Sequence, residues 1–421
     1  MPLMLPLLLA SVLSAPNVVI ISVDTLRADH LGCYGYASPT SPNLDTLAEG
    51  SLVFDDMICE VPLTGPSFCA MMTSRFPRET GVTRNGMRLS QDVPTVAESF
   101  SAAGYETLCV TSNWTLKGKL SGLDRGFEEY DDRFSKKRWG IIKSERGAEE
   151  VTALALKLLE ARDRGRPLFA WFHYSDPHAP YKLHRGFEVT DPKDVPDDRR
   201  GRIIVKYDSE IAYTDSLIAK VLAALPTENT YIVFVGDHGE SLWEHDYLGH
   251  GRRIYQPGLR IPFMISGPGL EPGRSDARVR GIDLAPTLLG LAGLDAAAGM
   301  QGVDVLNTDV PATRTRVIET YRGAVLNVPG AKEIMSNMGP QLQGILIDDW
   351  KLVTNGKRSE LFHLKRDPGE LENVAHLHPE LVATLTQQIR DWSDAFTNRQ
   401  SDEAELSDDD VEALRSLGYI E

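Results

Sequence analysis

The sequence has little of several features that would assign a function class directly. Only four of its 421 residues are cysteines, and none belongs to a C-x-x-C pair (Cys33, Cys59, Cys69 and Cys109). This spacing argues against a zinc knuckle and a disulfide framework, so we expect buried free thiols. Positive charge is also scarce, since 44 Lys and Arg oppose 60 Asp and Glu and the formal net charge is −16. Because no basic stripe is present, nucleic acid is not an expected partner.

Long apolar runs are missing as well, and we expect no transmembrane span, which takes about 20 apolar residues. The apolar stretch at the N-terminus covers only residues 2–13 and is followed by the small residues Ser14 and Ala15. No Lys or Arg precedes Arg27. We interpret residues 1–16 as a signal peptide and therefore predict an exported protein, periplasmic or extracellular. If the stretch is not a signal peptide, the prediction becomes a cytoplasmic protein.

Apolar runs alternate with amphipathic helical stretches along most of the chain. Strands are expected at 17–23, 167–173 and 231–235, and helices at 93–105, 147–165 and 209–225. This β-α-β alternation predicts an α/β fold with a large, mostly parallel sheet covered by helices on both faces. After residue 310, short strands at hairpin spacing and one helix indicate a small C-terminal α+β subdomain. We therefore divide the chain into a main domain, 17–310, and a subdomain, 311–421.

Acidic and histidine side chains follow three of the predicted strands. They are Asp24 after the first strand, His173, Asp176 and His178 at or after the second, and Asp237 and His238 after the third, with His245 and His250 soon behind. Because functional side chains collect at the carboxyl ends of the strands in such sheets, we expect these groups to meet at one edge. Together they predict a divalent metal site. The alternative is a polar edge whose groups satisfy one another, with an Asp such as Asp24 capping a helix.

The stretch VPLTGPSFCAMMTSR places Thr64 just before an expected helix, with Pro66 in its first turn. A helix N-terminus favours anions. A threonine there can simply cap the helix. It can also act as a nucleophile if a bound metal ion lowers the pKa of its hydroxyl. The stretch by itself leaves both roles open.

Several motifs, in order along the chain, resemble the sulfatase-like branch of the alkaline phosphatase superfamily. They are ISVDTLRADHLGCYGY, the T-x-P-S segment followed by TSRFPRETGV, HYSDPHAPY, GDHGESLWEHDYLGHG, GIDLAPTLLGLAGL, DDWKLV and ELFHLKRDPGELENVA. The similarity covers nearly all of residues 17–420. It implies an alkaline-phosphatase-like sheet with helices on both faces, a small C-terminal subdomain, and hydrolysis of sulfate or phosphate esters at a metal centre.

The chain departs from this family at the nucleophile. True sulfatases carry Cys or Ser at the first position of C/S-x-P-S-R and oxidise that residue to formylglycine, whereas this chain has Thr64 there and Phe68 in place of the arginine. Threonine cannot become that aldehyde. The resemblance also implies that Asn113 and His250 replace active-site lysines of sulfatases. These changes favour the chemistry of the superfamily's nucleotide phosphodiesterases and phosphoglycerol transferases.

The resemblance implies a role for each residue. Asp24, Asp237, His238 and Thr64 would bind one divalent ion, and the histidine favours zinc or manganese over calcium. Thr64 would attack phosphorus, while His178 and His250 would contact the substrate or protonate the leaving group. The expected substrate contacts are Asn85, Asn113 and Asp176. Asn85 matches an oxyanion donor of the phosphodiesterases, although an Asn-Gly turn is an equal alternative.

A second ion is the main alternative within this site, held by Asp176, His178 and His250. We interpret Arg27 and His173 as structural and His245 as a supporting residue. The leading hypothesis is a metal-dependent hydrolase or transferase of phosphate esters, particularly diesters, that acts on a small anionic substrate through Thr64. The alternatives are a sulfatase that works without formylglycine and an inactive homologue that serves as a binding protein. The sequence does not indicate an oligomeric state.

Overall fold

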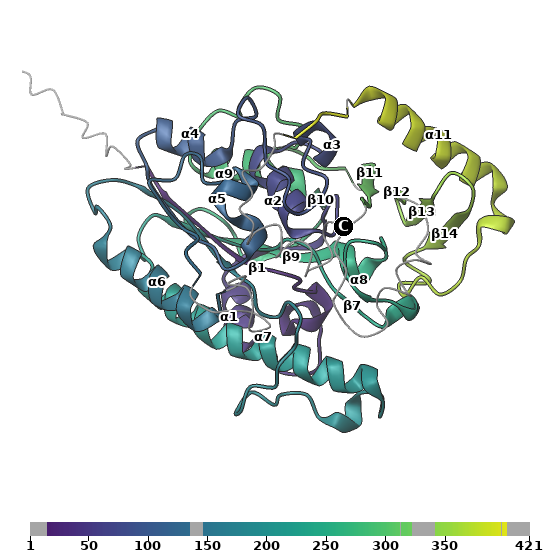
Figure 1. Cartoon of the computed structure of the whole chain (residues 1–421), viewed down its shortest axis with the longest axis horizontal. Helices are drawn as coiled ribbons and strands as arrows, with labels where there is room; N and C mark the ends of the chain where they lie inside the picture. Colours follow the sequence, from purple (N-terminus) through teal and green to yellow (C-terminus); the bar gives the residue numbers. More distant parts are fainter. Residues whose placement is uncertain (1–14, 135–145, 312, 322–341, 397, 402–421) are drawn as a thin grey trace, which may run out of the picture.

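The computed structural model describes residues 15–134, 146–311, 313–321, 342–396 and 398–401 (Figure 1). The predicted signal peptide, 1–16, lies almost entirely outside these ranges, so export stays a prediction. None of the described helices combines the length and the apolar character that crossing a bilayer requires.

An eight-stranded sheet runs through the molecule in the order β10-β2-β9-β6-β1-β5-β3-β4. Its strands are β1 (Asn17–Val23), β2 (Leu52–Ile58), β3 (Glu106–Val110), β4 (Glu129–Asp131), β5 (Leu168–Tyr174), β6 (Thr230–Gly236), β9 (Arg260–Ser266) and β10 (Gly273–Arg280). β1 lies between β5 and β6 and is parallel to both. Only β9 is antiparallel to its neighbours, β2 and β6, in the described sheet. The predicted mostly parallel sheet is therefore confirmed.

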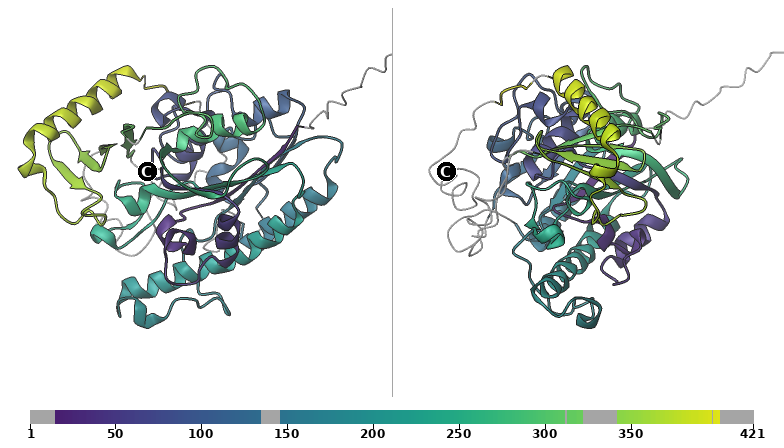
Figure 2. Two further views of the ribbon diagram at one scale, coloured as in Figure 1. Left: turned by 180° about the vertical axis from the view of Figure 1, so that it is seen from behind. Right: turned by 90° about the vertical axis from the view of Figure 1, so that its right-hand side faces the viewer.

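Helices cover both faces of this sheet (Figures 1 and 2). One face carries α2 (Thr64–Thr73), α4 (Val96–Ala102) and α9 (Leu284–Leu291), and the other carries α1 (Pro42–Glu49), α6 (Ala148–Ala161) and α7 (Arg199–Ala224). Successive residues of a strand point to opposite faces. In β1, Ile20 accordingly packs in the core under α2 and α9, whereas Val19 and Ile21 pack in the core under α6 and α7.

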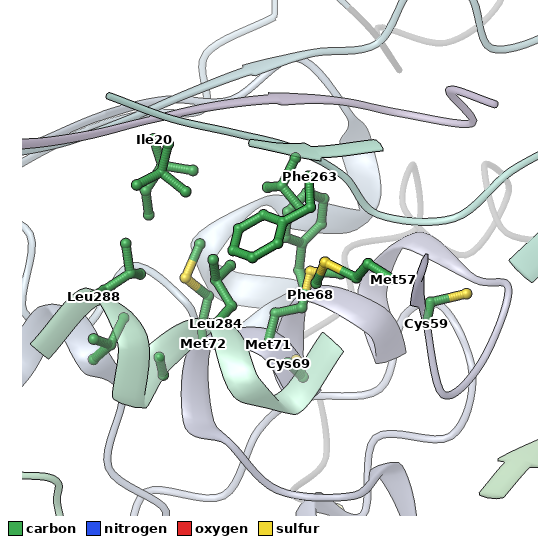
Figure 3. Packing of buried hydrophobic residues seen from close by; sticks show 14 of the residues in the cluster. Ile20, Met57, Cys59, Phe68, Cys69, Met71, Met72, Phe263, Leu284 and Leu288 are labelled. Atoms are coloured by element: carbon green, nitrogen blue, oxygen red, sulfur yellow. The ribbon is translucent and has the colours of Figure 1, made fainter. Parts of the chain in front are cut away.

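The α2 helix is buried along its whole length, between the sheet and α9. Figure 3 shows Phe68, Met71 and Met72 of α2 packed with Leu284 and Leu288 of α9 below the strands. Its apolar body fixes the start of the helix, and with it Thr64, beside the carboxyl ends of the central strands.

The α7 helix begins ten residues before the predicted start at residue 209, so that boundary was wrong. The physical reason is a cap: the side chain of Asp198 accepts hydrogen bonds from the backbone N–H groups of Arg200 and Gly201. The added turns bring Arg200 to within 3.2 Å of Glu244, which lies in the segment between β7 and β8.

A four-stranded antiparallel sheet forms the second unit, in the order β11 (Arg316–Glu319), β12 (Gln343–Ile347), β13 (Trp350–Thr354) and β14 (Ser359–His363). The α11 helix (Pro379–Ala395) packs on it through Leu385 and Ile389. The predicted small α+β unit is present, while its limits at 311 and 421 stay predictions. The short elements are β7 (Ser241–Leu242), β8 (Leu248–Gly249), α3 (Pro77–Thr80), α5 (Gly118–Ser121), α8 (Gln256–Leu259) and the 3-10 turns Ala28–His30, Gly32–Tyr34, Trp114–Leu116, Pro192–Asp194, Glu244–Asp246, Gly281–Asp283 and Ala375–Leu377.

Candidate metal centre and active site

The carboxyl ends of β1 and β6 place two acidic residues next to each other. Val23 pairs with Gly236 in the parallel register, so Asp24 and Asp237 leave the sheet side by side. One ligand atom each from Asp24, Asp237 and His238 lies within 4.8 Å of the others, and all three side chains are fully buried. The structure therefore brings together the strand-end residues that were predicted to bind a metal.

Thr64 joins this cluster from the start of α2. Its hydroxyl oxygen lies 3.4 Å from Oδ1 of Asp24 and 3.3 Å from Nε2 of His238. The N-cap position of α2 belongs to Leu63. The hydroxyl thus faces the acidic cluster, and the helix-capping alternative does not describe this geometry.

Each carboxylate of the cluster has one oxygen held in place and the other facing the centre. Oδ2 of Asp24 accepts from the side-chain amide of Asn113 at 2.5 Å, and Oδ1 of Asp237 accepts from the backbone N–H groups of Thr25 (3.1 Å) and His238 (2.8 Å). The remaining oxygens, Oδ1 of Asp24 and Oδ2 of Asp237, lie 3.7 and 3.4 Å from Nε2 of His238. The arrangement orients two oxygens and one nitrogen toward the same point.

The donor set fits a divalent ion. Nδ1 of His238 lies 2.9 Å from the carbonyl oxygen of Gly239, and because a carbonyl only accepts, Nδ1 carries the proton and Nε2 presents a lone pair. Oδ2 of Asp237 has no hydrogen-bond partner among the described residues. When both carboxyls are ionised, their lone pairs and that of Nε2 face one another, and a cation would relieve the repulsion. Oxygen and imidazole ligands suit zinc or manganese, although the identity of the metal stays a prediction.

The pKa shifts of the cluster also favour binding of a cation. Burial raises the pKa of Asp237 to about 7, and burial together with the charge of Asp237 raises the pKa of Asp24 to about 6. Burial and the neighbouring His250 lower the pKa of His238 to about 3, so this ring is neutral, as a ligand must be. Ionising both Asp24 and Asp237 in this buried site therefore costs free energy, and a bound cation would offset that cost.

Two further imidazoles lie beside the cluster. The ring centroid of His250 is 4.5 Å from that of His238 and 5.2 Å from that of His178. Nδ1 of His250 lies 3.2 Å from Oε1 of the buried Glu240. Burial alone would lower the pKa of His250, but Glu240 raises it above its usual value. The predicted pair His178 and His250 is thus next to the centre.

Glu240 was missed by sequence reasoning. The available signal was its place in the motif GDHGE, two residues after His238. Its contact with His250 depends on the β7–β8 hairpin, which returns the chain so that Ser241 pairs with Gly249.

Two predicted substrate contacts have other partners in the structure. Oδ1 of Asn85 accepts from the backbone N–H of Gly65 at 2.8 Å and so supports the first turn of α2. Oδ2 of Asp176 accepts from the N–H of Ala148 at the start of α6, also at 2.8 Å. Asp176 also lies near Glu210 of α7: burial, and to a smaller extent the charge of Asp176, raise the pKa of Glu210 to about 8. Substrate contacts of Asn85 and Asp176, and a second ion at Asp176, stay predictions.

The residues interpreted as structural lie in packed surroundings. Arg27 pairs with Asp29 at 2.7 Å and with Glu244 at 2.8 Å. His173 is fully buried, with Nδ1 3.0 Å from the hydroxyl of Ser22. His245 stacks on Tyr255 with ring centroids 3.7 Å apart. Phe68 packs against Trp171 (4.9 Å between centroids) and His173 (5.0 Å), so it belongs to the core.

Comparisons with known proteins show the family and the fold of the chain. The sulfatase family model matches residues 16–294, and the model of the N-sulphoglucosamine sulphohydrolase C-terminal region matches residues 243–395. The choline-sulfatase of Rhizobium meliloti is 26% identical, over 96% of this chain and 92% of its own length.

Two solved structures share the fold. A putative sulfatase from Bacteroides fragilis has a TM-score of 0.74 at 22% identity, covering 90% of this chain and 95% of its own. The phosphonate monoester hydrolase of Agrobacterium radiobacter has a TM-score of 0.74 at 20% identity, covering 90% and 96%. Because the sulfatase model spans more than half of the chain and includes Asp24, Thr64, Asp237 and His238, the chain belongs to the sulfatase family of ester hydrolases.

Proposed function

We propose that this protein is a metal-dependent hydrolase of phosphate esters, with a preference for diesters, and that Thr64 is its nucleophile. The observation that carries the proposal is the position of the Thr64 hydroxyl, 3.4 Å from Asp24 and 3.3 Å from His238 at the start of a buried helix. A hydroxyl beside metal-ligating groups and a helix N-terminus suits attack on an anionic ester.

The residues around Thr64 favour phosphate over sulfate. Because the side chain of threonine bears a methyl group on Cβ, its oxidation would give a ketone, and the formylglycine aldehyde is out of reach. Phe68, at the position of the sulfatase arginine, is buried in the core and offers no charge to an anion. Asn113 is neutral where sulfatases have lysine. A phosphate diester carries one negative charge and a monoester up to two, so this limited positive charge suits the diester.

When bound, a divalent ion would lower the pKa of the Thr64 hydroxyl and polarise the ester. The Thr64 hydroxyl already donates to Oδ1 of Asp24, so this carboxylate is the acceptor of its proton, while Nε2 of His238 is reserved for the ion. The Thr64 oxygen then forms a bond to phosphorus, the bond between phosphorus and the leaving oxygen breaks, and His250 gives that oxygen a proton. We assign this role to His250 because its ring lies beside the cluster and because, against the effect of burial, Glu240, Asp24 and Asp237 together raise its pKa. Water then attacks phosphorus and gives a proton to His250, while the bond between phosphorus and the Thr64 oxygen breaks. Thr64 regains its proton from Asp24, and the phosphate monoester is released.

The test is a substrate panel on protein reconstituted with zinc, manganese or calcium. 4-Nitrophenyl sulfate, 4-nitrophenyl phosphate and bis(4-nitrophenyl) phosphate share one leaving group, so their rates report on the transferred group. We expect the diester to react fastest, Thr64→Ala to lose about 10³-fold or more, and Thr64→Ser to keep part of the activity. Sulfate turnover with an inert diester would overturn the substrate preference. Unchanged diester turnover by Thr64→Ala would remove the nucleophile.

A sulfatase without formylglycine is the second candidate, and the family match together with the similarity to a choline-sulfatase favours it. It predicts that 4-nitrophenyl sulfate is the best substrate and that the peptide containing Thr64 has its unmodified mass. An inactive binding homologue predicts no turnover of any ester with any of the three ions.

A further inference from the structure

Thr25, directly after the metal ligand Asp24, has a strained backbone. Its φ is +54°, in the left-handed region. Among the non-glycine residues with positive φ in the described part of the chain, Thr25 is the β-branched one. A β-branched residue adopts this conformation rarely, and it persists only where the surroundings impose it.

The strained turn determines how Asp237 faces the metal centre. The backbone N–H of Thr25 donates to Oδ1 of Asp237 at 3.1 Å. With Oδ1 engaged by this bond and by the N–H of His238, Oδ2 is the oxygen that faces Asp24 and His238. If residue 25 relaxed to negative φ, the peptide before it would rotate and this N–H would no longer point at Asp237.

The hydroxyl of Tyr207 spans the turn. It donates to the carbonyl oxygen of Thr25 at 2.6 Å and accepts from the backbone N–H of Arg27 at 3.0 Å. Tyr207 is fully buried in α7, about 180 positions away along the chain. Its ring meets those of His30 and Tyr181 edge-on, with centroids 5.1 and 5.8 Å apart. Because this packing fixes the ring, the hydroxyl of Tyr207 stays at the turn formed by residues 25–27.

We propose that Tyr207 is a positioning residue of the metal centre, which acts through Thr25 on Asp237. Its two hydrogen bonds hold residues 25–27 in the left-handed turn, and the turn aims the Thr25 N–H at Asp237. The inference rests on the metal centre of the proposed function. It assigns Tyr207 no contact with the ion or the substrate.

The experiment compares Tyr207→Phe, which removes only the hydroxyl, with Thr25→Gly and the double variant. Tyr174→Phe is the matched control, because Tyr174 is equally buried and its hydroxyl lies 3.0 Å from Thr152 of α6. The readouts are the zinc dissociation constant from calorimetric titration and the thermal unfolding of the metal-free protein. Neither readout depends on catalytic turnover.

We expect Tyr207→Phe to weaken zinc binding about 10-fold or more, as changes behind a metal ligand do. In the Thr25→Gly background the same change should weaken binding less than about 3-fold, because glycine adopts positive φ without strain. Tyr174→Phe should lower the unfolding temperature and leave the dissociation constant unchanged.

Zinc binding by Tyr207→Phe equal to that of the unaltered protein would overturn the inference, and so would equal losses in both backgrounds. If Tyr207→Phe does not fold, a folded double variant supports the coupling to Thr25, and a double variant that also fails to fold overturns it. An unaltered protein that binds no divalent ion would overturn the metal centre of the proposed function, and this inference with it.

Discussion

The hydroxyl oxygen of Thr64 lies 3.3 Å from Nε2 of His238, although the two residues are 174 positions apart in the sequence. Thr64 is the first residue of α2, whose apolar side chains pack against the sheet, and His238 follows the central strand β6. Ser67, on the same helix, donates to the carbonyl oxygen of Asp237 at 2.7 Å and ties the two elements together. The packed core thus places the Thr64 hydroxyl against the cluster of Asp24, Asp237 and His238.

Removal of the metal should destabilise the protein. An ion that binds only the folded state adds about 2.7 kcal/mol of unfolding free energy at 100 times its dissociation constant. We expect a chelator to lower the unfolding temperature and added zinc or manganese to restore it. His238→Ala should abolish the response, whereas the exposed His376→Ala should retain it. An unfolding temperature that does not respond to any divalent ion would contradict the metal centre.

Asn113→Ala should weaken metal binding about 10- to 100-fold, because the amide that orients Oδ2 of Asp24 is lost. Calorimetric titration measures the effect, and the exposed Asn307→Ala is the control. A direct role of Asn113 in substrate binding alone would instead raise KM and leave the metal dissociation constant unchanged.

Glu240→Gln should slow the step in which the leaving group is protonated. The carboxylate contacts Nδ1 of His250 at 3.2 Å, and without its charge the pKa of His250 falls, so that less of the enzyme carries the proton to be donated. We expect kcat to fall about 10-fold or more for an alkyl phosphate diester and less for the nitrophenyl diester, since nitrophenolate leaves without a proton. Equal losses with both leaving groups would argue against His250 as the acid.

Glu60→Gln should change the pH dependence of stability. Burial raises the pKa of Glu60 from 4.5 to about 7, and its Oε2 has no partner among the described residues. Because the folded pKa is raised, the stabilisation that this group provides is complete below pH 4.5 and is lost as the pH rises through 7. The variant removes that loss, so above pH 8 it should be more stable by up to about 3 kcal/mol.

Urea unfolding of both proteins between pH 5 and pH 8 measures the difference. The gap should widen as the pH rises. A constant gap over this range would show that Glu60 keeps its ordinary pKa in the folded protein.

Phe68→Ala should destabilise the protein by about 3–5 kcal/mol, because it opens a cavity between α2 and the sheet. Phe68→Leu keeps most of the apolar volume and should cost less than about 1.5 kcal/mol. Urea unfolding gives both values. A loss of activity in Phe68→Leu without a loss of stability would mean that the ring contacts the substrate, contrary to its place in the core.

Local patterns predicted the fold and the meeting of Asp24, Asp237 and His238 at one edge of the sheet. The strands β1, β5 and β6 could be recognised in the sequence because a strand that is buried on both faces is apolar along nearly its whole length. Since parallel strands end at one edge, Asp24, Asp237 and His238 could be expected to meet there. The start of α7 was missed because a capping Asp198 in a polar stretch looks like any loop residue.

The sequence by itself determined the alternation of strands and helices and the family, because both are written in residue type and spacing. The tertiary structure alone decided what each polar atom faces. It turned Asn113 onto Asp24, brought Glu240 to His250, and placed the hydroxyl of Tyr207 across the strained turn at Thr25. The first and the last of these contacts join residues 89 and 182 positions apart, and the second joins residues 10 positions apart across a hairpin. All three depend on hydrogen-bond distances of about 3 Å, which packing sets and which spacing along the sequence does not encode.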